Sequence, residues 1–233
     1  MRQRKFLWIA ILHYVLALAC ICIYLLSELH PRVLLNPVGR LTLMGIFCLS
    51  SYTAGIMLCK LPSINKTLVM KSTFLVYFLC YLVLLLTFTL FDPMFGRRNH
   101  FLLFFADPVM QSNYMENYFN IIPFRTIAEY VSAASNGRMN FEIIATNLLG
   151  NFVALVPMAL FLPLFFRCCR KCRYFLIATA FTAVVIEGLQ LLLMAGACDI
   201  DDFILNTGGA YIAFLFLKIQ TCQRVLRKML PIE

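Results

Sequence analysis

Charged residues are scarce in this chain of 233 residues, and their scarcity argues against an ordinary soluble domain. Asp, Glu, Lys and Arg together make up only 13% of the sequence, about half of the ~25% that soluble domains carry. Hydrophobic residues make up 62%, and the mean hydropathy is +0.84. A soluble core of this length cannot bury so much apolar surface, so the sequence predicts an integral membrane protein.

The apolar stretches also lack the alternation over ~10 residues that marks the strands of a transmembrane barrel. They are continuous runs of about 20 residues, the length that crosses ~30 Å of hydrocarbon as a helix. We therefore expect an all-α membrane protein, a six-helix transmembrane bundle. The six runs are Phe6–Leu26, Leu41–Leu61, Ser72–Phe91, Ile143–Phe166, Tyr174–Ala195 and Phe203–Ile219.

The net charge of +9 would suit binding to nucleic acid, but the distribution of the basic residues argues against that partner. Fourteen Lys and Arg residues lie at the termini and in the even-numbered loops, against six in the odd-numbered loops. The positive-inside rule then places both termini in the cytoplasm. Ala17–Cys20 resembles a signal-peptide cleavage site, but the apolar run continues to Leu26, which favours a spanning helix.

Cysteine is nearly missing from the predicted outer loops, which contain only Cys198 and so cannot form an intramolecular disulfide. Cys168, Cys169 and Cys172 have the spacing of half a zinc site, but no fourth ligand lies nearby. A basic loop of reduced thiols next to the membrane is the interpretation that this sequence favours.

One predicted outer connection, Asp92–Glu142, is much longer than the others, and such loops carry function or partial structure. It contains two apolar pieces that are too short to span, Phe101–Phe105 and Ile121–Val131. Seven of its 51 residues are phenylalanine, which argues against a plain solvated loop. We expect the two pieces to be interfacial or re-entrant segments against the outer leaflet.

Strongly polar residues are rare within the last three predicted helices, and they lie in one layer. Asn147 and Asn151 are four residues apart and share a helix face, as do Glu187 and Gln190, which are three apart. At ~1.5 Å per residue, these four lie about 6 to 12 Å from the outer ends of their helices, and Asn206 lies about 5 Å in. Three aspartates precede the last helix, namely Asp199, Asp201 and Asp202.

Glu187 is the only acid well inside any of the six predicted helices. An ionisable residue at a helix centre costs about 2.5–3.5 kcal/mol or more and marks function by default. The alternative is that the amides are interhelical hydrogen-bond partners worth ~0.6 kcal/mol each, but that role does not explain a buried acid beside three aspartates. The layer therefore predicts a functional site.

Two further patterns predict local structure without a chemical role. Pro157 and Pro163 predict a kink or a loosened helix within the fourth run. A face of small residues predicts close packing of the sixth helix, since small side chains let two backbones approach. Its members are Gly208, Gly209, Ala210 and Ala213.

Four motifs together resemble the VanZ-like family. They are Asn120-Ile-Ile-Pro-Phe124, Asn147-x-x-x-Asn151 with Pro157, Glu187-x-x-Gln190, and Asp199 to Gly209 with Asn206. The resemblance covers roughly Ser72–Ile219. It would make residues 1–71 a two-helix addition, 72–219 the family's transmembrane domain and 220–233 a basic cytoplasmic tail.

The resemblance implies the bacterial plasma membrane, a link to glycopeptide resistance, teicoplanin above all, and a distant relation to membrane enzymes that exchange lipid head groups. The sequence departs from the family pattern twice. Ala197-Cys198 stands where the family often has an arginine before the aspartates, and Ala159 stands where it often has glycine. Without that arginine, Arg125 is the substitute we expect to attract phosphate.

Two hypotheses follow. In the first, the protein is an enzyme that acts at the outer leaflet on the head group of an anionic lipid or a lipid-linked cell-envelope intermediate. Glu187 is then the catalytic acid or base, and Arg125 supplies positive charge. The expected head-group contacts are Asn120, Asn147, Asn151, Gln190 and Asn206. A divalent cation is expected on Asp199, Asp201 and Asp202, because clustered carboxylates suit hard cations.

In the second hypothesis, the protein is not catalytic and binds a lipid, an antibiotic or a protein partner in the same cavity. No serine or cysteine paired with a base stands out as a nucleophile. A transporter has less support, because the sequence lacks a detectable internal repeat.

Overall fold

The computed structural model describes residues 2–29, 35–91 and 107–229, and this part of the chain is mainly helical. Six helices are long and apolar enough to cross a membrane: Gln3–Ser27, Pro37–Leu58, Lys66–Phe91, Phe141–Phe165, Cys172–Leu193 and Ile200–Leu217. Each overlaps one of the six predicted runs. The prediction of an all-α, multi-pass membrane protein is therefore confirmed.

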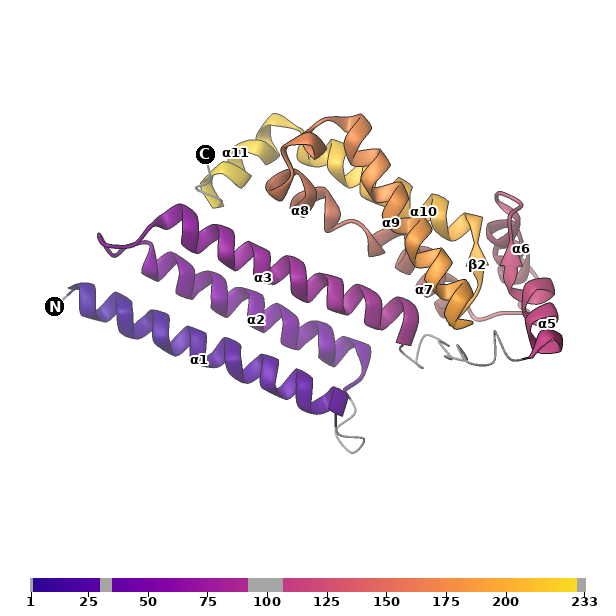
Figure 1. Ribbon diagram of the computed structural model, residues 1–233, viewed down its shortest axis with the longest axis horizontal. Coiled ribbons are helices and arrows are strands. Elements are labelled where there is room, and N and C mark those ends of the chain that lie inside the picture. Colours follow the sequence, from indigo (N-terminus) through magenta and orange to yellow (C-terminus); the bar gives the residue numbers. More distant parts are fainter. Residues whose placement is uncertain (1, 30–34, 92–106, 230–233) are drawn as a thin grey trace. The chain divides into compact units, whose positions relative to one another are not determined.

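The chain divides into two compact units, Met1–Cys80 with Arg224–Glu233, and Tyr81–Gln223. This division falls inside the third span, and the domain boundary after residue 71 stays a prediction. The first unit contains α1 (Arg2–Leu29), α2 (Pro37–Leu58) and most of α3 (Lys66–Leu86), which lie side by side (Figure 1).

Local sequence signals account for the helices of the first unit. Asn36 caps α2 by accepting the N–H of Gly39 at 2.7 Å, and Pro37 occupies the first helical position, where its missing N–H costs nothing. A hydroxyl cluster joins α2 to α3, since Tyr77 donates to the carbonyl of Cys48 at 2.6 Å and lies 2.9 Å from Ser51 Oγ. None of the predicted site residues lies in this unit.

The second unit contains the predicted site and begins with the end of α3, which continues as the π-helix η1 (Thr87–Phe91). Two helices and a strand from the long predicted loop follow: α5 (Pro108–Tyr118), β1 (Phe119–Asn120) and α6 (Arg125–Ser135). The remaining elements form the bundle: α7 (Phe141–Ala154), α8 (Met158–Phe165), the 3₁₀ helix η3 (Arg167–Arg170), α9 (Cys172–Leu193), β2 (Cys198–Asp199) and α10 (Ile200–Leu217). The division between the units falls within the last helix, α11 (Gln220–Met229), between Gln223 and Arg224.

The fourth span is broken, as its prolines predict. Helix α7 ends at Ala154 and α8 starts at Met158, because Pro157 has no N–H to donate and its ring clashes with the carbonyl of the residue four positions earlier. The break leaves the carbonyl of Ala154 outside the helical pattern. Tyr81 donates its hydroxyl to that carbonyl at 2.7 Å, which compensates for the lost backbone bond.

Of the predicted small-residue face of α10, Gly209 and Ala210 are buried, whereas Gly208 and Ala213 are only half-buried. A Cβ at Gly209 would lie 1.8 Å from the backbone carbonyl oxygen of Phe152 in α7, whereas a Cβ at Gly208 would meet nothing within 4 Å. Only a residue without a side chain fits at Gly209. The contact holds α7 against α10 three residues after Asn206.

The segment Ile121–Val131 forms an exposed turn and helix α6, and its place at the membrane interface stays a prediction. Ile121, Ile122 and Phe124 are exposed at the protein surface, and no residue of α6 is fully buried. An exposed apolar turn followed by an amphipathic helix suits a segment that lies in the membrane interface. The other expected piece, residues 101–105, lies outside the described residues.

Candidate functional site

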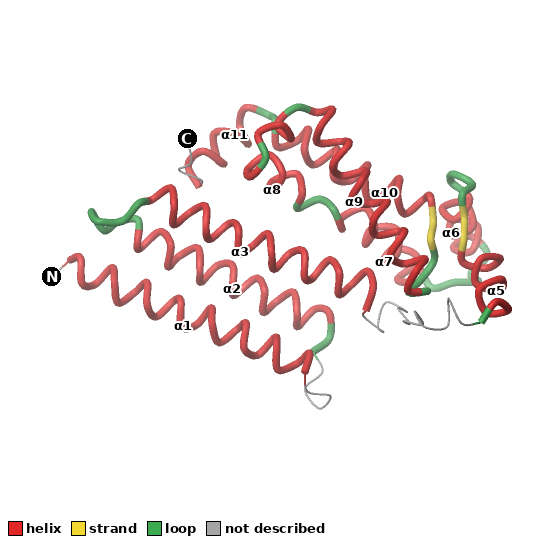
Figure 2. The backbone as a smooth tube through the Cα atoms, in the orientation of Figure 1, coloured by secondary structure: helices red, strands yellow, loops and turns green. Residues whose placement is uncertain are grey.

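A short parallel strand pair joins two motifs that lie about eighty residues apart in the sequence. Phe119 of β1 pairs with Cys198 of β2, and Asn120 pairs with Asp199. Figure 2 shows the two strands beside each other at the start of α10. The pairing brings the Asn120–Phe124 motif against the aspartates, which the sequence pattern alone did not predict.

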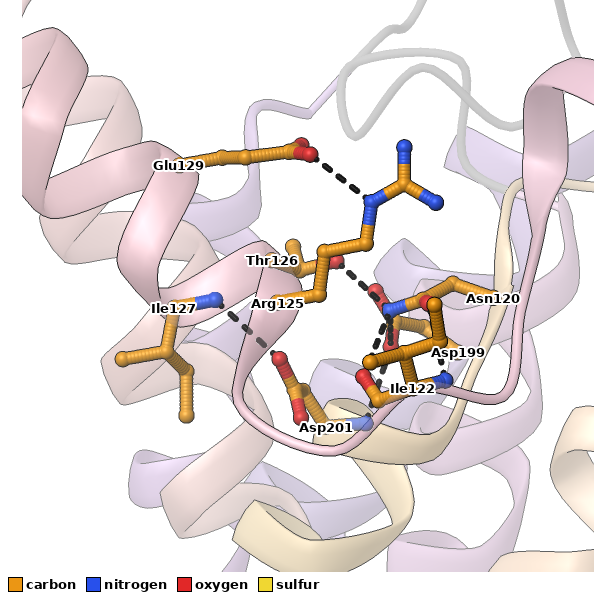
Figure 3. Close-up of polar contacts among 8 residues, drawn as sticks. All are labelled: Asn120, Ile122, Arg125, Thr126, Ile127, Glu129, Asp199 and Asp201. Carbon is orange, nitrogen blue, oxygen red and sulfur yellow. Dashed lines mark hydrogen bonds and ion pairs between the residues drawn. The ribbon is translucent and has the colours of Figure 1, made fainter.

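We call the place where the β1–β2 pair, the turn before α6 and the start of α10 meet the junction. Asp199 lies at its centre and is buried. It caps α10, because its Oδ1 accepts the N–H of Asp201 at 2.8 Å. The same oxygen accepts from the Asn120 side-chain amide at 3.0 Å (Figure 3). Asn120 in turn donates to Thr126 Oγ1 at 3.1 Å and accepts the N–H of Ile122 at 3.0 Å. Asn120 therefore holds the turn before α6 against the start of α10.

Asp201 is 1% exposed, and it stabilises the N-terminus of α6 from another helix. Its Oδ1 accepts the N–H of Phe124, and its Oδ2 accepts the N–H of Ile127 at 3.1 Å (Figure 3). Phe124, the N-cap residue of α6, has φ +63° and provides no side-chain cap. The carboxylate of Asp201 replaces that missing cap. It lies at the N-termini of both α6 and α10, where the helix dipoles are positive.

This geometry does not support the divalent-cation site that we expected on Asp199, Asp201 and Asp202. In the described part of the chain, no three His, Cys, Asp or Glu side chains are grouped as they would be around a metal ion. The physical reason is that two of the aspartates direct their oxygens at backbone N–H groups. Asp202 is only half-buried.

Glu187 is 8% exposed and lies in the last two turns of α9. Its Oε2 accepts the N–H of Asp199 at 2.9 Å, so Glu187 contacts the junction from α9. Burial raises the pKa of the neighbouring Cys198 thiol to about 11, with the charges of Glu187, Asp199 and Asp202 adding to the effect. The junction is thus rich in negative charge.

Gln190, one turn further along α9, is 2% exposed. Its Nε2 donates to the carbonyl of Thr89 in η1 at 3.1 Å, which ties α9 to the end of the third span. Tyr114 of α5 is buried and donates to the carbonyl of Gly196 and, at 3.3 Å, to that of Gln190. Tyr114, Thr126 and Thr89 were missed by sequence reasoning, because nothing in their local patterns distinguishes them from other loop and helix residues.

Three buried oxygen atoms in this unit have no hydrogen-bond partner within the residues that the structure describes. They are Gln190 Oε1, Asn206 Oδ1 and Thr207 Oγ1. The amide nitrogen of Asn206 is used by its own helix, since it donates to the carbonyl of Asp202 at 2.8 Å. An unpaired buried acceptor costs ~1–3 kcal/mol, so the two amide oxygens call for a hydrogen-bond donor, whereas the Thr207 hydroxyl can donate or accept.

Two of the predicted site residues direct their polar side chains to partners within their own helices. Asn147 is exposed, and its amide donates to the carbonyl of Ile143 in its own helix at 2.9 Å. Arg125 is exposed as well, and its Nε donates to Glu129 at 2.9 Å (Figure 3). Asn151 is half-buried. The structure therefore brings together Asn120, Glu187, Asp199 and Asp201, with Gln190 one helical turn away.

A family model described as VanZ/LLP1 matches residues 74–221 of this chain. The match covers more than half of the sequence and includes all elements of the junction. No curated protein and no solved structure matches the chain.

Proposed function

The chain belongs to the VanZ/LLP1 family, and we propose that it binds an anionic lipid or a lipid-linked cell-envelope intermediate at the outer leaflet and acts on its head group. The observation that carries the proposal is the buried carboxyl group of Glu187 inside a span, held by the N–H of Asp199. Burial of an ionisable acid inside a span costs free energy, so such a residue marks a functional site by default.

The surroundings of Glu187 suit a general acid or base. The bond from Asp199 N–H fixes one carboxylate oxygen, so the orientation of the group is set before a ligand arrives. The strand pair and the Asn120 contacts fix Asp199 itself. A proton transfer by Glu187 to or from a head-group oxygen would need such a fixed carboxyl group.

The chemistry of the unpaired atoms supports a ligand that enters with hydrogen-bond donors first. Gln190 Oε1 and Asn206 Oδ1 are acceptors, and Glu187 adds a carboxyl group. None of the lysines and arginines that the structure describes in this unit is buried. The hydroxyl or ammonium groups of a head group would satisfy the acceptors, while the phosphate would remain near the exposed guanidinium of Arg125.

The resemblance to VanZ-like proteins supports a role in tolerance of glycopeptide antibiotics such as teicoplanin. These antibiotics act at the cell envelope, where lipid-linked intermediates present their head groups. We propose that a changed lipid or intermediate alters access of the antibiotic, so teicoplanin tolerance is a second readout of the same activity.

Lipid profiles of cells with and without the protein test the proposal, with Glu187→Gln as the decisive variant. Glutamine is nearly isosteric and still accepts the Asp199 N–H, but it cannot transfer a proton. We expect the lipid change to disappear in Glu187→Gln at unchanged membrane abundance. A variant with the full lipid change would exclude Glu187 as the acid or base.

One observation favours a second candidate, binding without turnover. The buried acceptors Gln190 Oε1 and Asn206 Oδ1 need only a bound hydrogen-bond donor, not a reaction, to be satisfied. If the protein only binds its ligand, a lipid should co-purify with it while the cellular lipid profile remains unchanged.

A further inference from the structure

Helix α11 has the composition of a membrane-surface helix. Its four apolar residues recur at the spacing of one helix face, and all six polar residues lie on the opposite face. The apolar residues are Cys222, Val225, Leu226 and Met229. The polar face includes three cations, Arg224, Arg227 and Lys228. The chain contains no Asp or Glu between Asp202 and Glu233, so no acid in this stretch neutralises them.

The position of α11 in the chain places it at the edge of the hydrocarbon. The last span ends at Leu217, and α11 starts at Gln220. Two residues do not carry the chain away from the membrane, so a helix about 15 Å long must begin at the lipid–water boundary. Figure 1 shows α11 as a separate helix after α10.

Part of the apolar face of α11 is exposed where the structure describes it. Val225 is 51% exposed, and Cys222 and Leu226 are half-buried. A partly exposed apolar face beside the hydrocarbon, flanked by the exposed cations Arg224 and Arg227, fits the interface of a bilayer with anionic head groups. A solvated tail would not need this segregation of apolar and basic residues.

We propose that α11 is an interfacial helix that lies on the membrane with Val225 in the acyl-chain region and Arg224 and Arg227 on anionic lipid head groups. The occupant of the apolar face is the lipid surface itself. This inference is independent of the proposed function, because it concerns neither Glu187 nor the junction.

The second basic cluster of the chain supports the same surface. The loop between α8 and α9 contains Arg167, Arg170, Lys171 and Arg173, all exposed. It follows α8 and precedes α9, so two further crossings by α9 and α10 bring the chain back to the same side before α11. Lys218 Nζ lies 3.4 Å from Cys172 Sγ, which confirms that α9 starts where α10 ends.

Tryptophan fluorescence of the full-length protein in nanodiscs tests the proposal, because the sequence contains a single tryptophan, Trp8. In a Trp8→Phe background, Val225→Trp places a probe on the apolar face, and Arg224→Trp places a matched probe on the polar face. We expect lipids with brominated acyl chains to quench Val225→Trp strongly and aqueous acrylamide to quench Arg224→Trp strongly, with the reverse quenchers weak.

The charge requirement is tested by the lipid and by substitution. Each basic residue near an anionic surface shifts the local binding equilibrium by roughly fivefold. We expect quenching of Val225→Trp by brominated chains to fall when phosphatidylglycerol is replaced by phosphatidylcholine. It should fall as well when Arg224, Arg227 and Lys228 become Gln.

Three outcomes would overturn the proposal. Acrylamide access to Val225→Trp in both lipids would mean a solvated helix. Protection of that probe from both quenchers would mean that the apolar face docks on protein. Strong quenching by brominated chains that is independent of lipid charge would remove the anionic head groups from the proposal.

Discussion

The two ends of α9 and α10 carry charge of opposite sign and handle it in opposite ways. At the acidic end, the carboxyl groups are buried and accept backbone N–H groups; these residues are Glu187, Asp199 and Asp201. At the basic end, every cation is exposed; these residues are Arg167, Arg170, Lys171, Arg173 and Lys218.

The two ends differ in the groups that stabilise their charged side chains. A buried carboxylate needs donors fixed in place, because water is absent and an unsatisfied charge is expensive. The acidic end therefore depends on distant segments, namely the strand pair and the turn before α6. An exposed cation needs only water or lipid head groups, so the basic end depends on local sequence alone.

The largest expected effect is an all-or-none difference in labelling of the two ends. We predict that a membrane-impermeant thiol reagent added to intact cells labels Asn136→Cys, at the end of α6, in a variant without other cysteines. It should not label a variant that retains only Cys168 of the basic loop, because the positive-inside rule puts that loop in the cytoplasm. Both residues are exposed. The reverse pattern would place the acidic end in the cytoplasm.

Gly209→Ala should disrupt the packing of α7 against α10, which supports the acidic end. The new methyl group would lie 1.8 Å from the Phe152 carbonyl oxygen, so α7 and α10 must separate, at a cost of about 3 kcal/mol. Thermal unfolding of the purified protein in detergent measures the loss. Gly208→Ala is the matched control, since its methyl group meets nothing within 4 Å. Equal stability of the two variants would contradict the close approach.

Asp201→Asn should loosen α6 while the bundle survives. An amide presents one acceptor where the carboxylate presents two, so the N–H of Phe124 or of Ile127 loses its partner, which costs about 2 kcal/mol. Hydrogen exchange at these two amides should accelerate. Asp202→Asn is the control and should leave both amides protected. Restoration of protection by added Mg²⁺ would instead support a metal on the aspartates.

The smallest expected effect is on the reactivity of Cys198. Alkylation requires the thiolate, and with a pKa of about 11 only about one thiol in a thousand is ionised at pH 8, so the rate should rise about tenfold per pH unit. Glu187→Gln removes a neighbouring negative charge and so lowers this pKa, which speeds alkylation at a given pH. Exposed Cys168 serves as the reference in the same sample. An unchanged Cys198 rate in Glu187→Gln would mean that the carboxylate is neutral.

The sequence by itself determined the membrane class, the six spans, the break at Pro157 and the close packing at Gly209 and Ala210. These features depend on hydrophobic runs, on the missing N–H of proline and on side-chain size, all of which act over a few residues. It also indicated Glu187, the aspartates and Asn120 as site residues. The orientation of the termini remains a prediction from the distribution of Lys and Arg.

Only the tertiary structure decided how the polar residues divide their roles. Equal depth in the membrane suggested that Asn147 belongs with Glu187, but depth does not set the direction of a side chain, and Asn147 is exposed. Asp201 was expected to bind a divalent cation, yet it is buried and its oxygens accept the N–H groups of Phe124 and Ile127. Those donors come from a segment more than seventy residues earlier, and only the pairing of β1 with β2 brings them within reach.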